Sequence, residues 1–511
     1  MRAQNGEERR SCSSMAVSPH RFVRFQLVCS SQSGPDALPC TGGGRFQVTF
    51  RTDSRYYPSG SEKQLPVGTK GAALDKRFLF ASLCVDSGYH TGINHGIASL
   101  VPVVRKYSYQ VSNLNIRSHQ DFQQFTDHII AFRPSIVGFS CTSNQLKYLI
   151  KCSAELQRYP EILQIAGGPA STLDHDIILS KTAVKGACIG EGEISLGSLL
   201  NNIDQGKDIY ETQGFYWNTG NYIRRNAPIN FVSDLSLLDY PDYTVFNDPP
   251  VSSCRHIFIV LSRGCPYNCY YCCNMAISTV YPSPRRYFRV PTVKYSMNVL
   301  RDLLRLNPSA ESIIFEDDLL VSDKDWFIRF AKAYKEQIAI PYRVCIRVEC
   351  ITRDTVEALK RSGCFRVFIG LESGSEFIRY CVLNKRFTNK TLIDKCKMIK
   401  SAGIEILSLN MIGFPFEKKE HMRETLELNK EISPELGVCS FFYPYKGTEL
   451  YRICQKENLL KSQEEMMEIT NFNTRPAIKM DPVQEEDCIY FHKQLIDYFS
   501  QRLKSRESAY L

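Results

Sequence analysis

From Arg77 onwards, short apolar runs alternate with segments whose apolar residues recur at helical spacing. Five apolar runs that could be strands precede residue 190, namely Phe78–Cys84, Val111–Ile116, Ile136–Ser140, Ile162–Ala166 and Val184–Ile189. Helical patterns lie between them, at Gly96–Lys106, Asp121–Phe132 and Gln145–Gln157. Strands that alternate with helices are typical of a doubly wound parallel sheet. We therefore expect an α/β domain of this kind over residues 73–205.

A second alternating series begins at His256 and runs to about Tyr451. Its predicted strands are Ile257–Leu261, Ser312–Phe315, Val344–Val348, Val367–Ile369, Ile404–Leu409 and Val438–Phe442. Six strand–helix units are too few for the usual eight-stranded barrel, so the pattern predicts an open, partial (β/α)6 barrel over residues 251–455.

Three further segments complete the expected organisation. Residues 206–250 contain aromatic residues, a turn at Asn218–Asn221 and several prolines, which indicates a hairpin and a linker. Residues 456–511 are expected to form a helical C-terminal segment, whose amphipathic helix carries Ile489, Ile496, Phe499 and Leu503 on one side. Residues 1–72 are rich in Gly, Ser and Pro without periodicity, which predicts a disordered extension. A misplaced translation start or an organellar transit peptide would be alternative explanations.

Charge and cysteine content exclude several classes of protein. The net charge is +9, but residues 1–72 hold ten basic and five acidic residues, so the remainder is nearly neutral and no nucleic-acid partner is expected. The longest uncharged apolar-leaning stretch, Ile406–Phe416, is far below the roughly 18 residues of a membrane span. The 20 cysteines are spread through α/β patterns without a secretory signal, which favours reduced thiols and a cytoplasmic location.

The strongest motif is a C-x3-C-x2-C triplet, formed by Cys265, Cys269 and Cys272 directly after the first strand of the second series. Three thiolates on one short loop can each hold one iron of a 4Fe-4S cluster and leave the fourth iron open to a ligand. Structural zinc is the alternative, and it needs a fourth ligand such as Cys273 or Cys254. The location of the triplet at a strand end favours the cluster.

This loop resembles the cluster-binding motif of the radical S-adenosylmethionine (SAM) superfamily, and the resemblance extends over about Ser252 to Tyr451. It implies that the open iron chelates SAM and that one electron from the cluster cleaves SAM to a 5′-deoxyadenosyl radical. It also implies that the backbone of Tyr271 helps to hold adenine. No protein side chain is assigned as a catalytic residue.

Three later positions match strand ends at which similar enzymes bind SAM. The resemblance implies that Glu372 contacts the ribose, with a solvated loop acid as the alternative. For Arg347, contact with the SAM carboxylate and a structural ion pair are both open. Gly413 lies in a turn that resembles the family's close approach of backbone to ligand. The chain departs from the family after this turn, because Phe416 stands where Gly is common.

Residues 77–204 resemble the cobalamin-binding, Rossmann-like domain that precedes many radical SAM enzymes. Parallel sheets bind ligands at the carboxyl ends of their strands, and the resemblance assigns cobalamin contacts there to Ser140, Thr142, Gly167, Gly168, Gly190 and Glu191. The Asp-x-His-x-x-Gly signature is missing, so we expect neither His90 nor His95 to bind cobalt. A degenerate sheet that no longer binds cobalamin stays open.

These features predict a cobalamin-dependent radical SAM enzyme that transfers a methyl group to an unactivated carbon. One alternative keeps the cofactors but gives cyclisation, oxidation or rearrangement without methyl transfer. Another is a non-catalytic cobalamin- or redox-responsive binding protein. The expected partners are a small-molecule or peptide substrate and a low-potential electron donor such as a ferredoxin or flavodoxin.

Overall fold

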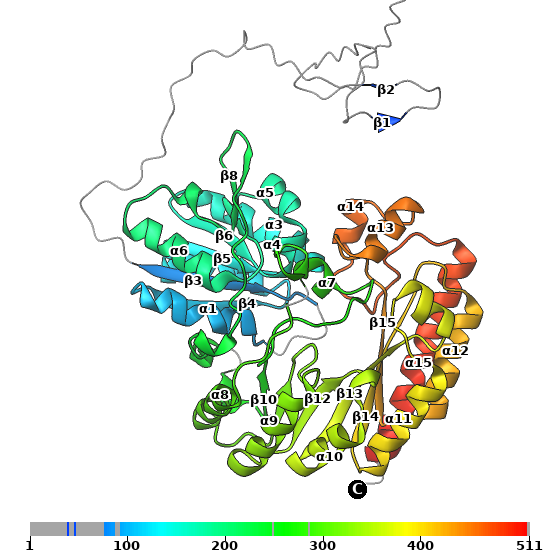
Figure 1. Ribbon diagram of the computed structural model, residues 1–511. Coiled ribbons are helices and arrows are strands. Elements are labelled where there is room, and N and C mark those ends of the chain that lie inside the picture. The colour runs from blue at the N-terminus through cyan, green and yellow to red at the C-terminus, as the bar shows by residue number, and fades with distance from the viewer. Residues whose placement is uncertain are drawn as a thin grey trace, which may run out of the picture. The chain divides into compact units, whose positions relative to one another are not determined.

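The structure of the chain is a computed structural model that describes residues 38–39, 45–46, 76–86, 92–247, 250–284 and 287–507 (Figure 1). The chain divides into two compact units, residues 1–70 and 71–511. In the first unit, β1 (Leu38–Pro39) and β2 (Arg45–Phe46) form an antiparallel pair. The prediction for the rest of residues 1–72 lies outside the described residues, and so does His90.

The first large sheet has seven strands in the order β4-β3-β5-β6-β7-β8-β9. Its strands are β3 (Arg77–Leu83), β4 (Gln110–Ile116), β5 (Ile136–Ser140), β6 (Leu163–Gly167), β7 (Gly186–Cys188), β8 (Phe215–Asn218) and β9 (Ile223–Arg225). The first five are parallel, which confirms the predicted α/β fold. The predicted hairpin forms as β8 and β9, but β8 pairs antiparallel with β7, so the hairpin extends this sheet.

Helices cover both faces of the first sheet, as a doubly wound fold requires. The helices are α1 (His95–Lys106), α2 (Asp121–Phe132), α3 (Leu146–Glu155), α4 (Pro169–Leu173), α5 (His175–Lys181) and α6 (Gly192–Asp204). Successive side chains of β3 point to opposite faces. Phe78 and Phe80 pack in the core that contains the buried residues of α1 and α6, whereas Leu79 packs with α2, α3 and α5.

The second sheet has six parallel strands in sequence order, which confirms the predicted partial barrel. Its strands are β10 (His256–Ile259), β11 (Ser312–Phe315), β12 (Tyr342–Ile346), β13 (Cys364–Glu372), β14 (Glu405–Ile412) and β15 (Leu436–Phe441). The helices that accompany it are α7 (Cys273–Ser278), α8 (Val293–Leu306), α9 (Lys324–Gln337), α10 (Arg353–Ser362), α11 (Asn389–Ser401) and α12 (Lys419–Ile432). All six strands therefore end at one edge, where their loops meet.

The C-terminal segment contains α13 (Glu449–Lys456), α14 (Gln463–Met467) and the long α15 (Pro482–Glu507). Helix α15 lies beside β15 and α12 (Figure 1). Its buried side chains are Cys488, Phe491, Leu495 and Phe499. The predicted apolar side was therefore partly wrong, because Ile489 and Leu503 are exposed. The buried side chains follow one another at intervals of three or four residues, which places them on one face of the helix.

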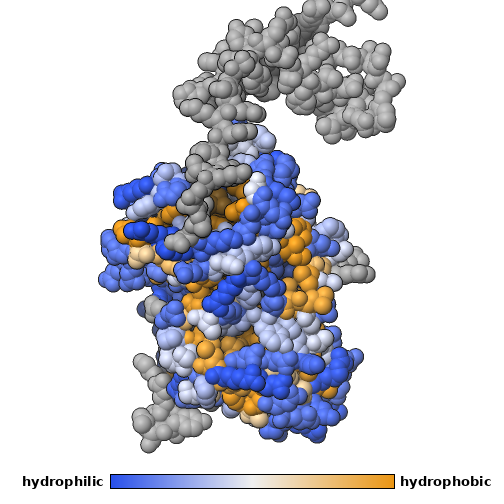
Figure 2. All heavy atoms as spheres, turned by 90° about the vertical axis from the view of Figure 1, so that its left-hand side faces the viewer, coloured by the Kyte–Doolittle hydropathy of each residue, from blue (hydrophilic) through white to orange (hydrophobic). Residues whose placement is uncertain are grey.

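The two sheets share one continuous apolar core. It joins α1 and α6 of the first sheet to β10–β13 and α8–α9 of the second, and it includes Tyr243, Val245 and Phe246 from the predicted linker. On the molecular surface, the face that carries α1 and α6 is largely hydrophilic, with apolar residues in patches (Figure 2). No helix in the described part of the chain combines the length and apolarity of a membrane span.

Candidate functional site

The three cysteines of the triplet lie on the loop between β10 and α7, and Cys272 is the residue that caps α7. Cys269 is buried, and the other two are half-buried. Burial raises the pKa of Cys265 to about 12, and the neighbouring Cys272 and Cys269 thiols add to the rise. The loop therefore holds three thiols close to one another at the carboxyl edge of the second sheet.

Buried Asp317, which follows β11, fixes the start of this loop. Its Oδ1 accepts hydrogen bonds from the backbone N–H of Leu261, at 2.9 Å, and from the backbone and hydroxyl of Ser262. Burial raises the pKa of Asp317 to about 6. The interactions with Ser262 tie the cysteine loop to the end of the neighbouring strand.

Arg347, at the end of β12, contacts the cysteine loop directly. Its Nη1 lies 2.9 Å from Cys269 Sγ, its Nη2 lies 2.7 Å from Glu349 Oε1, and its guanidinium stacks 3.9 Å from the centre of the Tyr267 ring. The structure therefore gives Arg347 both an ion pair with a carboxylate and a position beside the predicted cluster. Both interpretations of this residue are compatible with that geometry.

Glu372 ends β13 and is almost completely buried. Its Oε1 accepts hydrogen bonds from the hydroxyl of Tyr271, at 3.0 Å, and from Nζ of Lys385, at 2.9 Å. Tyr271 precedes Cys272, so this carboxylate lies next to the cysteine loop. Sequence reasoning missed Lys385, which is 2% exposed and carries the charge opposite to that of Glu372.

Gly413 follows β14 with φ of +84°, and Glu417 closes the turn. The Glu417 carboxylate accepts hydrogen bonds from the backbone N–H groups of Gly413 and Phe414, at 2.6 and 3.1 Å. Full burial raises the pKa of Glu417 to about 8. Phe416, the departure from the family pattern, also has a positive φ of +64°, a conformation that glycine adopts more easily.

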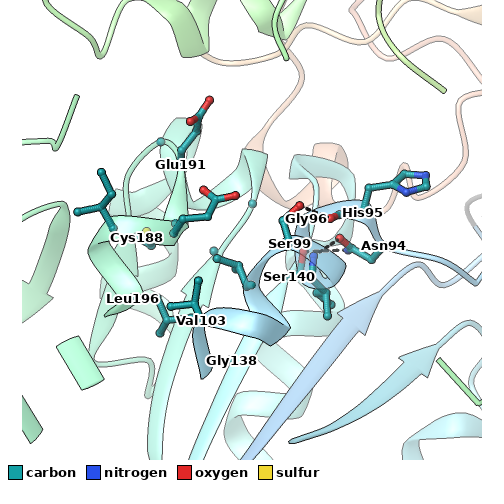
Figure 3. A pocket seen from close by; sticks show the side chains of 18 of the residues that line it. Asn94, His95, Gly96, Ser99, Val103, Gly138, Ser140, Cys188, Glu191 and Leu196 are labelled. Carbon is teal, nitrogen blue, oxygen red and sulfur yellow. Dashed lines mark hydrogen bonds between the residues drawn. The ribbon is translucent and has the colours of Figure 1, made fainter. Parts of the chain in front are cut away.

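A large cavity of about 840 Å³ opens at the carboxyl edge of the first sheet (Figure 3). All six residues assigned to cobalamin line it, namely Ser140, Thr142, Gly167, Gly168, Gly190 and Glu191. Asn94 Nδ2 donates to Ser140 Oγ at 3.1 Å, which fixes that hydroxyl at the cavity wall. Apolar residues such as Val103 and Leu196 also line the cavity, so polar and apolar parts of a ligand can both be held.

His95 also lines this cavity, but both of its ring nitrogens have partners. Nδ1 lies 2.9 Å from the Tyr243 hydroxyl, and Nε2 lies 2.9 Å from Glu316 Oε2, at the end of β11. The side chain therefore bridges the first sheet and the second. The expectation that His95 does not bind cobalt stays a prediction.

The cavity is also lined by Leu261, Ser262 and Arg263, the residues that lead into the cysteine loop. Arg263 forms ion pairs with Glu191 and Glu193 at the start of α6, and Arg289 binds Glu191 with two nitrogens. We call the contacts among Glu191, Glu193, Arg263 and Arg289 the interdomain ion pairs. Glu191 thus has basic partners on both of its carboxylate oxygens, and its predicted contact with cobalamin stays a prediction.

Sequence reasoning missed Arg263 and Arg289 as partners of these acids. The only signal was the charge of the two acids in Gly190–Glu193 and of the arginine two residues before Cys265. Arg263 and Arg289 pair through their backbones, with N···O distances of 2.9 and 3.0 Å, and this short ladder presents both guanidinium groups to α6.

Within the described ranges, no group of three or more His, Cys, Asp or Glu side chains is arranged to hold a single metal ion. The assignment of Cys265, Cys269 and Cys272 to an iron–sulfur cluster, with zinc as the alternative, stays a prediction.

Comparison with known proteins identifies both halves of the chain. Residues 259–428 match the family model of the Radical SAM superfamily, and residues 82–200 match that of the B12 binding domain. The chain is 24% identical over 401 residues to an uncharacterized methyltransferase of Pyrococcus horikoshii, covering 77% of this chain and 83% of the relative. It is 25% identical over 364 residues to the hopanoid C-3 methylase of Methylococcus capsulatus, covering 66% and 64%.

A solved structure has the same fold. The radical SAM methyltransferase TsrM from Kitasatospora setae, determined with tryptophan and a SAM analogue bound, superposes with a TM-score of 0.60. The match covers 74% of this chain and 76% of TsrM at 14% sequence identity, so it supports the fold alone.

The residues present fit the cofactors of this family. Three neighbouring thiols on one loop suit a 4Fe-4S cluster, a carboxylate beside them suits SAM, and the glycine-lined cavity suits cobalamin. The chain therefore contains a radical SAM domain with a B12-binding domain ahead of it, and it is a cobalamin-dependent radical SAM enzyme of the methyltransferase-like kind.

Proposed function

We propose that the protein transfers a methyl group from SAM to an unactivated carbon of its substrate. The observation that carries this proposal is the shared wall of the cavity. Ser140 and Gly168 from the first sheet line it together with Arg263, which lies two residues before Cys265. A corrinoid in the cavity would therefore lie beside the loop that holds the cluster, which is the proximity that a radical methyl transfer requires.

When bound, the cluster with SAM supplies one-electron cleavage of a carbon–sulfur bond, and cobalamin supplies the methyl-transfer chemistry. The chain's own residues bind and orient these groups. Cys265, Cys269 and Cys272 hold the cluster, and Glu372 accepts hydrogen bonds from the SAM ribose. Ser140, Thr142 and the glycine positions at 167, 168 and 190 contact the corrinoid. Arg347 adds a positive charge beside Cys269.

The proposal includes the partners and the location. The substrate is a small molecule or a peptide, and a low-potential ferredoxin or flavodoxin in the cytoplasm reduces the cluster. The described cysteines are all free thiols, which is compatible with a reducing compartment. Reduction of the reconstituted protein by a purified flavodoxin system, followed by SAM cleavage, tests this part.

The reaction products distinguish methyl transfer from its alternatives. Anaerobically reconstituted protein, supplied with cobalamin, SAM and candidate substrates, should form S-adenosylhomocysteine together with 5′-deoxyadenosine. Cyclisation, oxidation or rearrangement would give only 5′-deoxyadenosine. A binding protein without turnover would give neither product, and that outcome would overturn the proposal.

Cysteine variants test the cluster assignment. Cys265→Ala, Cys269→Ala and Cys272→Ala should each abolish the near-ultraviolet absorbance of the cluster and the cleavage of SAM, because each thiolate is expected to bind one iron. The adjacent Cys273→Ala is the matched control and should retain both signals. Retention of the cluster in Cys272→Ala with its loss in Cys273→Ala would show that the third ligand is misassigned.

A further inference from the structure

A lysine that no motif assigns lies buried beside the predicted ribose contact. Lys385 is 2% exposed, and its Nζ lies 2.9 Å from Glu372 Oε1 and 2.5 Å from the carbonyl oxygen of Gly370. Burying an ammonium group is costly unless the charge is paired and hydrogen-bonded. The ammonium group of Lys385 therefore depends on the Glu372 carboxylate to balance its charge, and its hydrogen bond in turn holds that carboxylate in place.

The two carboxylate oxygens of Glu372 differ. Oε1 accepts from both Tyr271 and Lys385. No group of the described residues donates to Oε2. An ionised carboxylate has about four acceptor positions, so Oε2 keeps acceptor capacity that the protein does not use. The two donors on Oε1 fix the plane of the carboxylate and leave Oε2 for a ligand.

Two backbone features support the same orientation. Glu372 has a φ of +66°, a left-handed conformation that is strained for a residue with a side chain and persists only where the surroundings enforce it. A Cβ at Gly370 would lie 2.4 Å from Glu372 Oε1 and 2.7 Å from Lys385 Nζ. Only glycine at position 370 leaves room for this ion pair.

We propose that Lys385 is a positioning residue for SAM, which holds Glu372 so that Oε2 accepts hydrogen bonds from the ribose hydroxyls. The inference rests on the proposed function, because it takes Glu372 as the ribose contact. Lys385 does not touch the reacting atoms. Its removal should therefore weaken binding of the nucleoside part of SAM while the cluster and its open iron are unaffected.

The test compares two probes on anaerobically reconstituted protein. SAM carries the ribose, whereas methionine has the same amino and carboxylate groups without it. Lys385→Met should weaken SAM binding, measured by equilibrium dialysis, by about 10- to 100-fold, the usual effect of losing a hydrogen bond to a charged group. Methionine binding should change less than about twofold.

Three further variants complete the experiment. Lys385→Gln keeps a donor and should lose less SAM affinity than Lys385→Met, which a purely space-filling role would not produce. Tyr271→Phe removes the other hydrogen-bond donor to Glu372 Oε1 and should weaken the binding of SAM more than the binding of methionine. Lys324→Met removes an exposed lysine paired with Asp354 and should change neither affinity.

Each outcome is decisive. An unchanged SAM affinity in Lys385→Met, or equal losses for SAM and methionine, would overturn the role of Lys385. If Lys385→Met does not retain the cluster, Lys385→Gln and Tyr271→Phe decide by the same two affinities. Wild-type protein that holds no cluster or does not bind SAM would instead contradict the proposed function.

Discussion

Two glutamates, one at each predicted cofactor site, are held by basic side chains in different ways: Glu372 is buried and Glu191 is partly buried. Glu372 of the radical SAM domain has both of its donors on one oxygen. Glu191 of the cobalamin-binding domain has Arg289 on one oxygen and both Arg289 and Arg263 on the other. A carboxylate with an open oxygen can still take a ligand, whereas one with both oxygens paired mainly joins parts of the protein.

The origin of the cations differs as well. Lys385 lies 13 residues from Glu372, within the same domain. Arg289 lies 98 residues from Glu191, and Arg263 lies 70 residues from Glu193, both across the domain boundary. The first pair lies at a predicted ligand site inside one domain. The second set joins one domain to the other, and three of its four residues, Glu191, Glu193 and Arg263, line the cavity of the first sheet.

Removing Arg289 should have the largest effect on stability. Arg289→Met removes a buried guanidinium and leaves the partly buried Glu191 with an incomplete set of partners; breaking a fully buried ion pair typically costs about 3–5 kcal/mol, and we expect a loss near the lower end of that range. Denaturant unfolding measures the loss. Arg305→Met, which breaks an exposed ion pair with Asp302, is the control and should cost less than about 1 kcal/mol. Equal, small losses in both variants would remove the distinction between the two glutamates.

Two glycines test whether the sites can be damaged separately. A Cβ at Gly190 would lie 2.4 Å from the Tyr281 hydroxyl, and a Cβ at Gly370 would lie 2.4 Å from Glu372. Each clash should cost about 1–3 kcal/mol. We expect Gly190→Ala to weaken cobalamin binding and Gly370→Ala to weaken SAM binding, measured by spectrophotometric titration and equilibrium dialysis. A variant that weakens the binding of cobalamin and of SAM equally would contradict the view that the two ligands have separate sites.

Conservative changes of the two glutamates give a smaller but sharper comparison. Glu372→Gln should reduce SAM affinity by about tenfold, because the charged acceptor of the ribose is lost. Glu191→Gln should leave SAM affinity within about twofold of wild type, since its oxygens serve the interdomain ion pairs. The reverse order of effects would show that the open oxygen does not mark the ligand contact.

Glu417 provides a third case, a buried glutamate whose carboxylate accepts hydrogen bonds from two backbone N–H groups and from no side chain of the described residues. Burial raises its pKa to about 8 from 4.5, so the folded state retains a proton that the unfolded state has lost. Its contribution to stability should be present below pH 4.5 and be lost as the pH rises to about 8. Unfolding at several pH values should show this decline, and Glu417→Gln should flatten it.

The fold and the cysteine loop could be predicted because their signals are local. Alternation of apolar runs fixes both sheets, and three cysteines within eight residues need no tertiary information. Glu372 could be singled out because the segment after the predicted strand Val367–Ile369 resembles a strand end at which similar enzymes contact the ribose of SAM. The ligand roles assigned to these residues stay predictions.

The remaining features depend on the folded chain. Nothing local pairs Glu193 with Arg263 or brings Lys385 to Glu372, because a loop with a π-helix at Ile378–Val382 separates that lysine from its partner. The buried face of α15 was misjudged for a similar reason. Several faces of the helix carry apolar residues, and only the packing of α15 against β15 and α12 shows that the face with Cys488, Phe491, Leu495 and Phe499 is the buried one.

The continuous apolar core determines how this chain can be divided. Tyr243, Val245 and Phe246 of the predicted linker pack in the same core as Val101 of α1 and Leu300 of α8. A fragment ending at residue 250 would expose these rings and aliphatic side chains to water, and a fragment beginning there would lack them. We therefore expect that neither half folds on its own and that the two halves fold as one cooperative unit.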